Sequence, residues 1–175
     1  MQISSNIEQQ QWYALYVNSR AEKKVMDILL HKNIEAYVPI VKIMKQWSDR
    51  KKLVEIPLFN GYVFVNILNS LKDEVLQTKG VVNFVRHIGK IAVIREVEIE
   101  RLKQIVSLGY YLEAEVTNKK YNKGERIRIL SGPLKNIEGF VLHNNNEQFI
   151  EVLLESIGYC IKVKLPQGII ESVNI

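Results

Sequence analysis

The apolar residues of this chain follow two different periodicities in its two parts. Up to residue 109, runs in which every second residue is apolar alternate with runs at helical spacing, such as Glu96 to Leu108. From residue 123 onward only the alternating runs occur, separated by turn residues such as Gly132-Pro133. This change predicts two domains, residues 1–109 and 123–175, joined by a weakly periodic polar linker at residues 110–122.

The first part is predicted to be a compact α+β unit, with an antiparallel sheet flanked by helices. Ser19 and Glu22 have the spacing of a capping box before the first helix, and Asn33 is suited to end that helix. Pro39 indicates either an edge position or the end of a strand. The expected strands are 12–17, 35–41, 53–56, 62–67 and 81–85, and the expected helices are 21–32, 71–79 and 96–108, with a loop at 86–95.

The second part is predicted to contain strands and no helix. Short alternating runs with turn residues between them, five in about fifty residues, are typical of a small β-barrel. The expected strands are 127–129, 140–142, 149–154, 159–165 and 169–173.

Residues 42–52 are predicted to form the tip of a projecting hairpin. The segment contains five basic residues, one acid and the lone Trp47 beside a Ser-Asp turn signal. One interpretation is a loop that contacts phosphates, with Trp47 available to stack on a base. The alternative is a solvated hairpin whose lysines serve solubility.

The stretch Ile56 to Val65 combines a turn with an aromatic strand. Pro57 and Asn60-Gly61 open the turn, after which Tyr62 and Phe64 share one face of the strand. We expect the aliphatic face to be buried and the aromatic face to stay partly open for docking a partner. The alternative is a core strand that is buried on both faces.

The formal net charge of +5 is concentrated in the first part of the chain. Residues 1–110 contain 16 Lys and Arg against 11 Asp and Glu, whereas residues 111–175 contain 8 of each. A localised basic surface suits nucleic acid or an acidic protein, although the same charge also serves solubility.

Several classes of site and location are not expected from this sequence. Hydrophobic residues make up 47%, enough for a folded core, and the absence of a membrane-length apolar run or a secretory signal predicts a cytoplasmic protein. The three histidines are dispersed, and the single Cys160 lies in an alternating strand. No phosphate-binding loop or nucleophile elbow occurs, so we expect neither metal, cofactor nor enzymatic activity.

Motifs in both parts resemble the NusG family of transcription elongation factors, in which an N-terminal domain precedes a KOW domain. The resemblance covers nearly the whole chain. The N-terminal motifs are Trp12-Tyr13, Glu22-Lys23-Lys24, Pro39, Phe59, Gly61-Tyr62-Val63-Phe64-Val65 and Gly80-Val81-Val82-Asn83-Phe84-Val85. The C-terminal motifs are Lys123-Gly124-Glu125-Arg126-Ile127-Arg128-Ile129, Gly132-Pro133 and Glu138-Gly139-Phe140-Val141.

The resemblance implies an SH3-like five-stranded KOW barrel after the α+β domain, and it implies partners. The first domain would dock on the clamp helices of the largest RNA polymerase subunit through Tyr16, Pro57, Leu58, Phe59, Tyr62 and Phe64. Nucleic acid, in particular the non-template DNA strand, is expected to be contacted by Lys42, Lys45, Arg50, Lys51, Lys52, Lys79 and Arg86. Lys79 is the residue carried over from the specialised branch of the family, whereas the hairpin residues are included on their charge alone. The KOW domain would present Leu134, Ile137, Ile157 and Tyr159 to a second partner, with Rho or a ribosomal protein as candidates.

Within the family, the segments 47–52 and 57–59 look most like the specialised antiterminators, RfaH-like and especially UpxY-like. That branch suppresses pausing and termination on selected long operons, such as those for surface polysaccharides. Asn60 stands where the family usually has Pro, Asn136 where the barrel turn often has Gly, and Ile157-Gly158-Tyr159 where housekeeping members tend to carry Phe-Gly-Arg. The last difference puts Rho or ribosome binding in doubt.

Two alternatives remain open at this point. The chain could be a housekeeping NusG-type factor that links polymerase to Rho or the ribosome, or a KOW-containing RNA or ribosome binder. We expect a monomer without membrane contact, whose second half is a β-barrel in the resting protein. β-Branched residues such as Ile127 and Ile161, and turns such as Gly132-Pro133, oppose the helical hairpin known for some RfaH-like members.

Overall fold

The computed structural model describes residues 9–47, 49–109, 112–116, 126–129, 135–144 and 147–165. The chain forms two compact units, each discontinuous in sequence. The first contains Met1–Val38 and Asn60–Glu96, and the second contains Pro39–Phe59 and Val97–Ile175. The predicted domain boundary near residue 109 stays a prediction.

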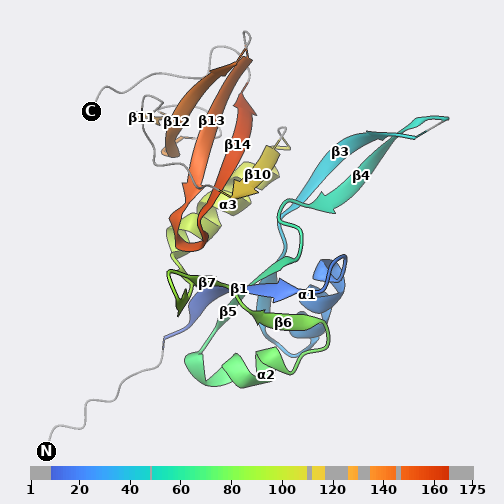
Figure 1. Ribbon diagram of the computed structural model, residues 1–175, viewed down its shortest axis with the longest axis vertical. Coiled ribbons are helices and arrows are strands. Elements are labelled where there is room, and N and C mark those ends of the chain that lie inside the picture. The colour runs from blue at the N-terminus through green and yellow to red at the C-terminus, as the bar shows by residue number, and fades with distance from the viewer. Residues whose placement is uncertain are drawn as a thin grey trace, which may run out of the picture. The chain divides into compact units, whose positions relative to one another are not determined.

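An antiparallel sheet forms the core of the first unit (Figure 1). The strand order is β2-β5-β1-β6, and β9 also pairs with β1. The central strand β1 pairs Ala14 with Phe64 of β5, and both residues are buried. Strand β2 lies at the edge, as the nearby Pro39 predicted. The strands are β1 (Gln11–Val17), β2 (Glu35–Tyr37), β5 (Tyr62–Ile67), β6 (Val81–Phe84) and β9 (Val93–Ile94).

Helix α1 (Glu22–His31) packs through Val25 and Leu29, which are one turn apart and fully buried. It ends before Asn33, whose φ of 59° confirms the predicted stop. The predicted capping box is wrong, because Ala21 occupies the cap position and no side chain caps the helix. Glu22 instead accepts a hydrogen bond from the backbone N–H of Gly61 at 2.7 Å, so a distant donor replaces the local one.

Two short elements complete the first unit. The 3-10 turn η1 (Asn69–Leu71) leads into α2 (Lys72–Leu76), which is shorter than predicted. The segment expected to be a loop forms a small hairpin of β7 (Arg86–His87) and β8 (Lys90–Ile91). Strands of two residues are too short to show a periodic pattern in sequence.

The predicted hairpin is present in the second unit as a long two-stranded ribbon (Figure 1). Strand β3 (Ile40–Gln46) pairs antiparallel with β4 (Lys51–Pro57) along its whole length. The backbone N–H of Trp47 donates to the carbonyl of Arg50 at 2.8 Å and closes the turn.

The second unit also contains α3 (Glu96–Ser107), except its first residue, and a five-stranded antiparallel sheet of order β10-β14-β13-β12-β11. Its core includes Ile150, Val152, Ile161 and Val163. The 3-10 turn η2 (Glu155–Ile157) joins β13 to β14. The strands are β10 (Leu112–Val116), β11 (Arg126–Arg128), β12 (Glu138–Asn144), β13 (Glu147–Leu154) and β14 (Tyr159–Leu165).

The fifth strand of this sheet is not the predicted one. Residues 112–116, assigned to a linker, pair with β14, so the linker prediction is wrong there. The sequence of this short strand, Leu-Glu-Ala-Glu-Val, alternates too briefly to predict a strand, and its pairing with β14 determines its conformation. The predicted strand at 169–173 lies outside the described residues. Strands β10 and β11 do not pair in the described part of the chain, so closure into a barrel is not shown.

The α+β prediction is confirmed. Beyond residue 109, the described residues form strands, turns and the 3-10 turn η2. Among the described helices, none combines the length and the apolar character needed to cross a membrane.

Candidate partner and nucleic-acid interfaces

The aromatic face of β5 is more buried than predicted. Phe64 is fully buried and its ring lies 6.5 Å from that of Tyr37, measured between centroids. Tyr62 is also buried, and its ring packs edge-on against Tyr16 at 4.9 Å. The expectation of a partly open face is therefore wrong for Tyr62 and Phe64. Both faces of β5 are covered, as in the alternative interpretation.

Tyr16 is the candidate docking residue that the first unit exposes. Its side chain is 41% exposed, and the hydroxyl of Tyr62 donates to its hydroxyl at 3.2 Å. The strand β1 fixes its backbone opposite Tyr62 in the sheet register. Tyr16, supported by the buried Tyr62, therefore offers a partner an aromatic ring and a hydroxyl group on a rigid strand.

The other docking candidates, Pro57, Leu58 and Phe59, belong to the second unit. Pro57 ends β4, and the N–H of Leu58 donates to the carbonyl of Pro39 at 2.8 Å. Leu58 is buried and Phe59 almost fully so. The ring of Phe59 packs edge-on against Tyr159 at a centroid distance of 5.3 Å. Phe59, predicted to dock on polymerase, thus contacts Tyr159, which was predicted to belong to the KOW partner surface.

The predicted KOW partner surface is mostly core. Ile137 and Ile157 are buried, so their predicted exposure is wrong, and Leu134 lies outside the described residues. The carbonyl of Ile137 accepts from Ile129 N–H at 3.0 Å, which pairs its backbone with that of the buried Ile129. Tyr159 is half-buried and packs on Phe59. An apolar residue beside a turn is expected from sequence to lie at the surface, but Ile137 and Ile157 are part of the core.

Sequence reasoning missed Glu98, a buried carboxylate next to this surface. Glu98 lies in α3, is 1% exposed, and accepts hydrogen bonds from Ser156 N–H at 3.3 Å and from the Ser156 hydroxyl. Burial of a carboxylate is unfavourable unless it is hydrogen-bonded. The contact ties α3 to η2, directly before Tyr159. No sequence signal distinguished Glu98 from the solvated acids of the same helix.

The β3–β4 hairpin brings five of the predicted nucleic-acid residues together. Lys45 lies directly opposite Lys52 in the register, although like charges in this position repel. The other three are Lys42, Arg50 and Lys51. Two have acidic neighbours, since Lys42 lies 4.0 Å from Glu55, and Arg50 lies 3.8 Å from the adjacent Asp49.

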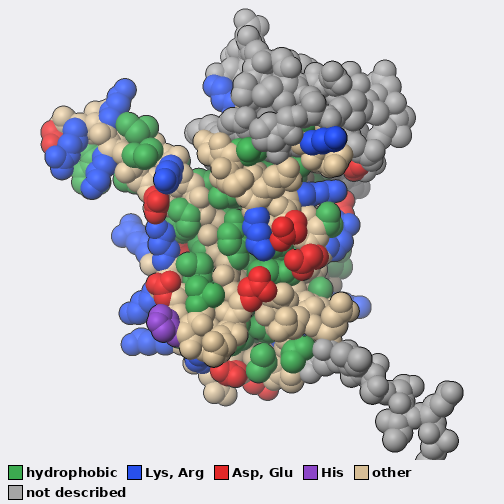
Figure 2. Space-filling model, turned by 180° about the vertical axis from the view of Figure 1, so that it is seen from behind, with side chains coloured by type: hydrophobic (Ala, Val, Ile, Leu, Met, Phe, Trp, Pro, Cys, Tyr) green, Lys and Arg blue, Asp and Glu red, His purple; other side chains and the backbone are tan. Residues whose placement is uncertain are grey.

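Exposed apolar side chains lie among these cations. Met44 and Leu53 are paired across the ribbon and both are exposed, and Trp47 is exposed at the turn. Figure 2 shows Lys and Arg side chains along this arm with hydrophobic side chains between them. A basic ribbon with exposed apolar groups can bind phosphates and stack on bases.

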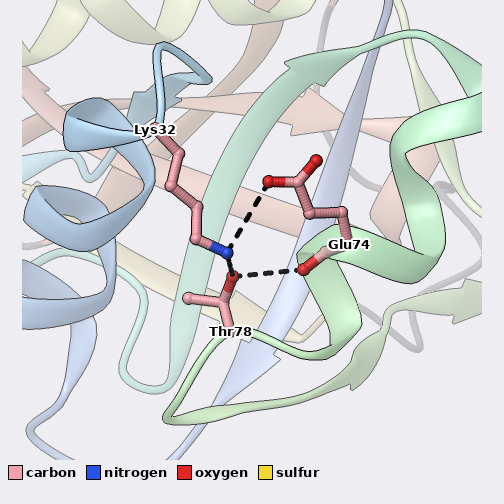
Figure 3. A network of polar contacts seen from close by, with 3 residues as sticks. All are labelled: Lys32, Glu74 and Thr78. Carbon is pink, nitrogen blue, oxygen red and sulfur yellow. Dashed lines mark hydrogen bonds and ion pairs between the residues drawn. The ribbon is translucent and has the colours of Figure 1, made fainter.

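Lys79 is exposed and directly follows Thr78. Figure 3 shows the polar network that Thr78 forms with Lys32 and Glu74. Lys32 donates to the hydroxyl of the buried Thr78 at 3.2 Å and lies 3.7 Å from the carboxylate of Glu74. The Thr78 hydroxyl donates to the carbonyl of Glu74 at 3.3 Å. The network joins the end of α1 to α2.

Gly80, the next residue, is required by close packing. It has φ of 98°, and a Cβ there would lie 2.8 Å from Cγ2 of Val25. Its carbonyl accepts from Asn18 N–H at 2.9 Å. The turn therefore presents Lys79 on a defined backbone, while Arg86, the last predicted residue, is exposed on β7.

Comparison with known proteins adds independent information. A family model described as "Transcription termination factor nusG" matches residues 10–103. The "Transcription termination/antitermination protein NusG" of Borreliella burgdorferi is 26% identical, over 74% of this chain and 80% of that protein. A solved structure described as "Domain interaction in Thermotoga maritima NusG" matches with a TM-score of 0.56 and 21% identity, covering 95% of this chain and 98% of that one. At this identity the structural match concerns the fold.

Proposed function

This chain belongs to the NusG family of transcription termination and antitermination factors, since the family model matches residues 10–103 of its 175, and from this membership we propose that it binds RNA polymerase and suppresses pausing and termination. The proposal depends mainly on which residues the family model matches. The matched segment includes the exposed Tyr16, the β3–β4 hairpin and the Lys79 turn.

Docking on polymerase, through the clamp helices of its largest subunit, would centre on Tyr16. This ring is exposed and supported by Tyr62 through a ring contact and a hydroxyl hydrogen bond. Partly exposed aromatic residues on a rigid strand are frequent hot spots in protein interfaces. Tyr62 then acts as a positioning residue for Tyr16, and Phe64 as part of the core.

The hairpin and the Lys79 turn would contact nucleic acid at the elongation complex, in particular the non-template DNA strand. Supporting this role are the facing Lys45 and Lys52, which repel each other when no anion is bound, and the network that orients Lys79. We propose no catalytic step. In the part of the chain that the structure describes, no group of three His, Cys, Asp or Glu residues could hold a metal ion.

A more specific role follows from the sequence of the hairpin and its return strand. We infer that the chain is a specialised antiterminator that acts in the cytoplasm on selected long operons, with its second half as a KOW barrel for another partner. The motifs at residues 47–52 and 57–59 support this assignment. Recruitment of Rho or a ribosomal protein remains the alternative, as in a housekeeping factor.

Affinity capture with the tagged full-length protein, followed by transcription assays on a template with a terminator, tests the proposal. We expect polymerase subunits to be captured and read-through to increase. Replacing Tyr16 with Ala should weaken polymerase binding by about 1–2 kcal/mol. The control is Leu30→Ala, an exposed apolar residue on α1 that should bind as the parent protein does. Capture of ribosomal particles without polymerase would reject the proposal.

A further inference from the structure

Three residues from neighbouring strands form a row across the sheet of the first unit. Tyr16 of β1 lies directly opposite Tyr62 of β5 on one side and Asn83 of β6 on the other (Figure 1). Side chains that lie opposite each other in an antiparallel sheet point to the same face. Tyr62 is buried, whereas Tyr16 is 41% exposed and Asn83 is exposed. The accessible part of this row is therefore an aromatic ring beside an amide.

The strand that contains Asn83 is irregular directly before this residue. The register shifts between the pairs Tyr16–Asn83 and Val17–Val81, so Val82 has no opposite residue in β1. An extra residue of this kind is a β-bulge, and bulges are over-represented at sheet edges and next to active sites, where they redirect a side chain. The bulge at Val82 is in a position to redirect the side chain of Asn83.

A backbone donor fixes the orientation of the Asn83 amide. The N–H of Val85 donates to the carbonyl of Ala14 in β1, so the N–H of Phe84 points to the opposite side of β6. On that side no described strand pairs with β6, and Oδ1 of Asn83 accepts the Phe84 N–H at 2.8 Å. Because a backbone N–H can only donate, the atom that it meets is the amide oxygen. The NH2 group of Asn83 is left to donate elsewhere.

A second donor in this row is the hydroxyl group of Tyr16. It accepts the hydroxyl of Tyr62 at 3.2 Å, so its own hydrogen is available to a further acceptor. The chain around Asn83 is basic, since residues 75–95 contain four Lys and Arg residues, one His and no Asp or Glu. A carboxylate complements donors in such surroundings, because it only accepts hydrogen bonds and carries negative charge.

We propose that Asn83 is a specificity-determining residue of the docking surface, and that its NH2 group and the Tyr16 hydroxyl bind the carboxylate of an Asp or Glu on the protein partner. The inference rests on the proposed function, in which Tyr16 docks on RNA polymerase, and adds the chemical group that the polymerase presents there. Addition of a partner strand to the edge of β6 is less suitable, because the bulge and the capped Phe84 N–H interrupt the row of free backbone groups that it needs.

Asn83→Asp tests the proposal, because it keeps the oxygen that accepts the Phe84 N–H and replaces the NH2 donor with a negative charge. We expect the full-length variant to bind purified RNA polymerase about 10-fold more weakly than the parent protein at low salt, since two carboxylates then face each other. The loss should become smaller at high salt, which screens repulsion between exposed charges but does not repair a folding defect. Biolayer interferometry at both salt concentrations measures the affinities, and thermal unfolding checks the fold.

Asn69→Asp is the matched control. It makes the same chemical change at an exposed residue of η1 outside the row, so it should bind polymerase as the parent protein does at both salt concentrations.

Asn83→Lys locates the carboxylate directly. A carbodiimide joins an amine to a nearby carboxylate, so this variant in complex with polymerase should give a cross-link from position 83 to an Asp or Glu of a polymerase peptide. Mass spectrometry identifies the peptide, and the parent protein, which lacks the amine, should not yield it.

The outcomes separate this inference from the proposed function. Absence of polymerase binding by the parent protein would reject both. If the parent binds and Asn83→Asp binds equally well or more tightly, or if Asn83→Lys binds without forming the cross-link, the carboxylate partner alone is rejected. A loss of affinity for labelled single-stranded DNA by Asn83→Asp, with polymerase binding unchanged, would assign the row to nucleic acid instead.

Discussion

Each of the two units contains a buried glutamate in the first turn of a helix. One carboxylate binds the turn at Gly61, and the other binds the 3-10 turn η2 at Ser156. Glu22, the first residue of α1, accepts the backbone N–H of Gly61 at 2.7 Å. Glu98, near the start of α3, accepts both the backbone N–H and the hydroxyl of Ser156. Acids in this position are favoured by the helix dipole, which lowers the cost of burying them.

The two glutamates differ in the residue that must donate the hydrogen bond. Any residue except proline could supply the N–H that Glu22 binds, but the φ of 78° at Gly61 restricts that position to glycine. Glu98 instead depends on the side chain of Ser156. The first anchor therefore constrains the backbone that leads into Tyr62, whereas the second depends on side-chain chemistry next to Tyr159. Comparing variants at the two anchors separates these effects.

The largest effect is expected for Glu98→Ala. The substitution removes the acceptor for both Ser156 donors and leaves a cavity between α3 and η2, so we expect the free energy of unfolding to fall by about 3 kcal/mol. Urea denaturation of the full-length protein measures it. Glu100→Ala is the control, because this exposed residue of the same helix loses only its pair with Lys103. Equal stability of the two variants would show that the Glu98 anchor is unimportant.

Gly61→Ala should have the next largest effect, about 2 kcal/mol, through the cost of a left-handed conformation and displacement of the N–H from Glu22. The matched variant is Gly89→Ala, which has φ of 76° and nothing within 4 Å of the added Cβ. It should share the backbone strain alone, about 1 kcal/mol. If thermal unfolding shows equal losses, the Glu22 anchor adds nothing to the requirement for glycine.

Glu22→Gln should reduce stability by about 1 kcal/mol, because the amide keeps the shape of the side chain but accepts a weaker hydrogen bond than the carboxylate. Denaturation at neutral pH measures the change. Asp27→Asn, an exposed substitution on the same helix, should be close to neutral. A loss at Asp27 as large as that at Glu22 would mean that overall helix charge, and not the anchor, is responsible.

The smallest effect is expected at Tyr62, which follows the first anchor. Tyr62→Phe removes the hydroxyl that donates to Tyr16 and should cost about 0.5 kcal/mol. Adding Tyr16→Phe to form a double-mutant cycle isolates the coupling between the hydroxyls. Additive effects of the two substitutions would show that the hydrogen bond does not contribute, leaving the ring contact as the support of Tyr16.

Much of the fold was predictable from periodicity. The strand at 62–67, the first helix and the 42–52 hairpin lie where alternation, helical spacing and the turn signal placed them. Strands of two residues were missed, and strand β10 was taken for linker, because such segments acquire their conformation from pairing partners far away in sequence.

The candidate sites were predictable as residue types and not as exposed surfaces. By itself, the sequence determined the positions of the aromatic strand, the basic hairpin and the motifs that resemble the NusG family, because local patterning and turn chemistry are written along the chain. Tertiary structure alone decided that Phe64 and Ile157 are core, that Tyr16 is exposed, and that Glu22 and Glu98 are buried anchors. Burial depends on which distant segments cover a side chain, and that information is absent from any local stretch of sequence.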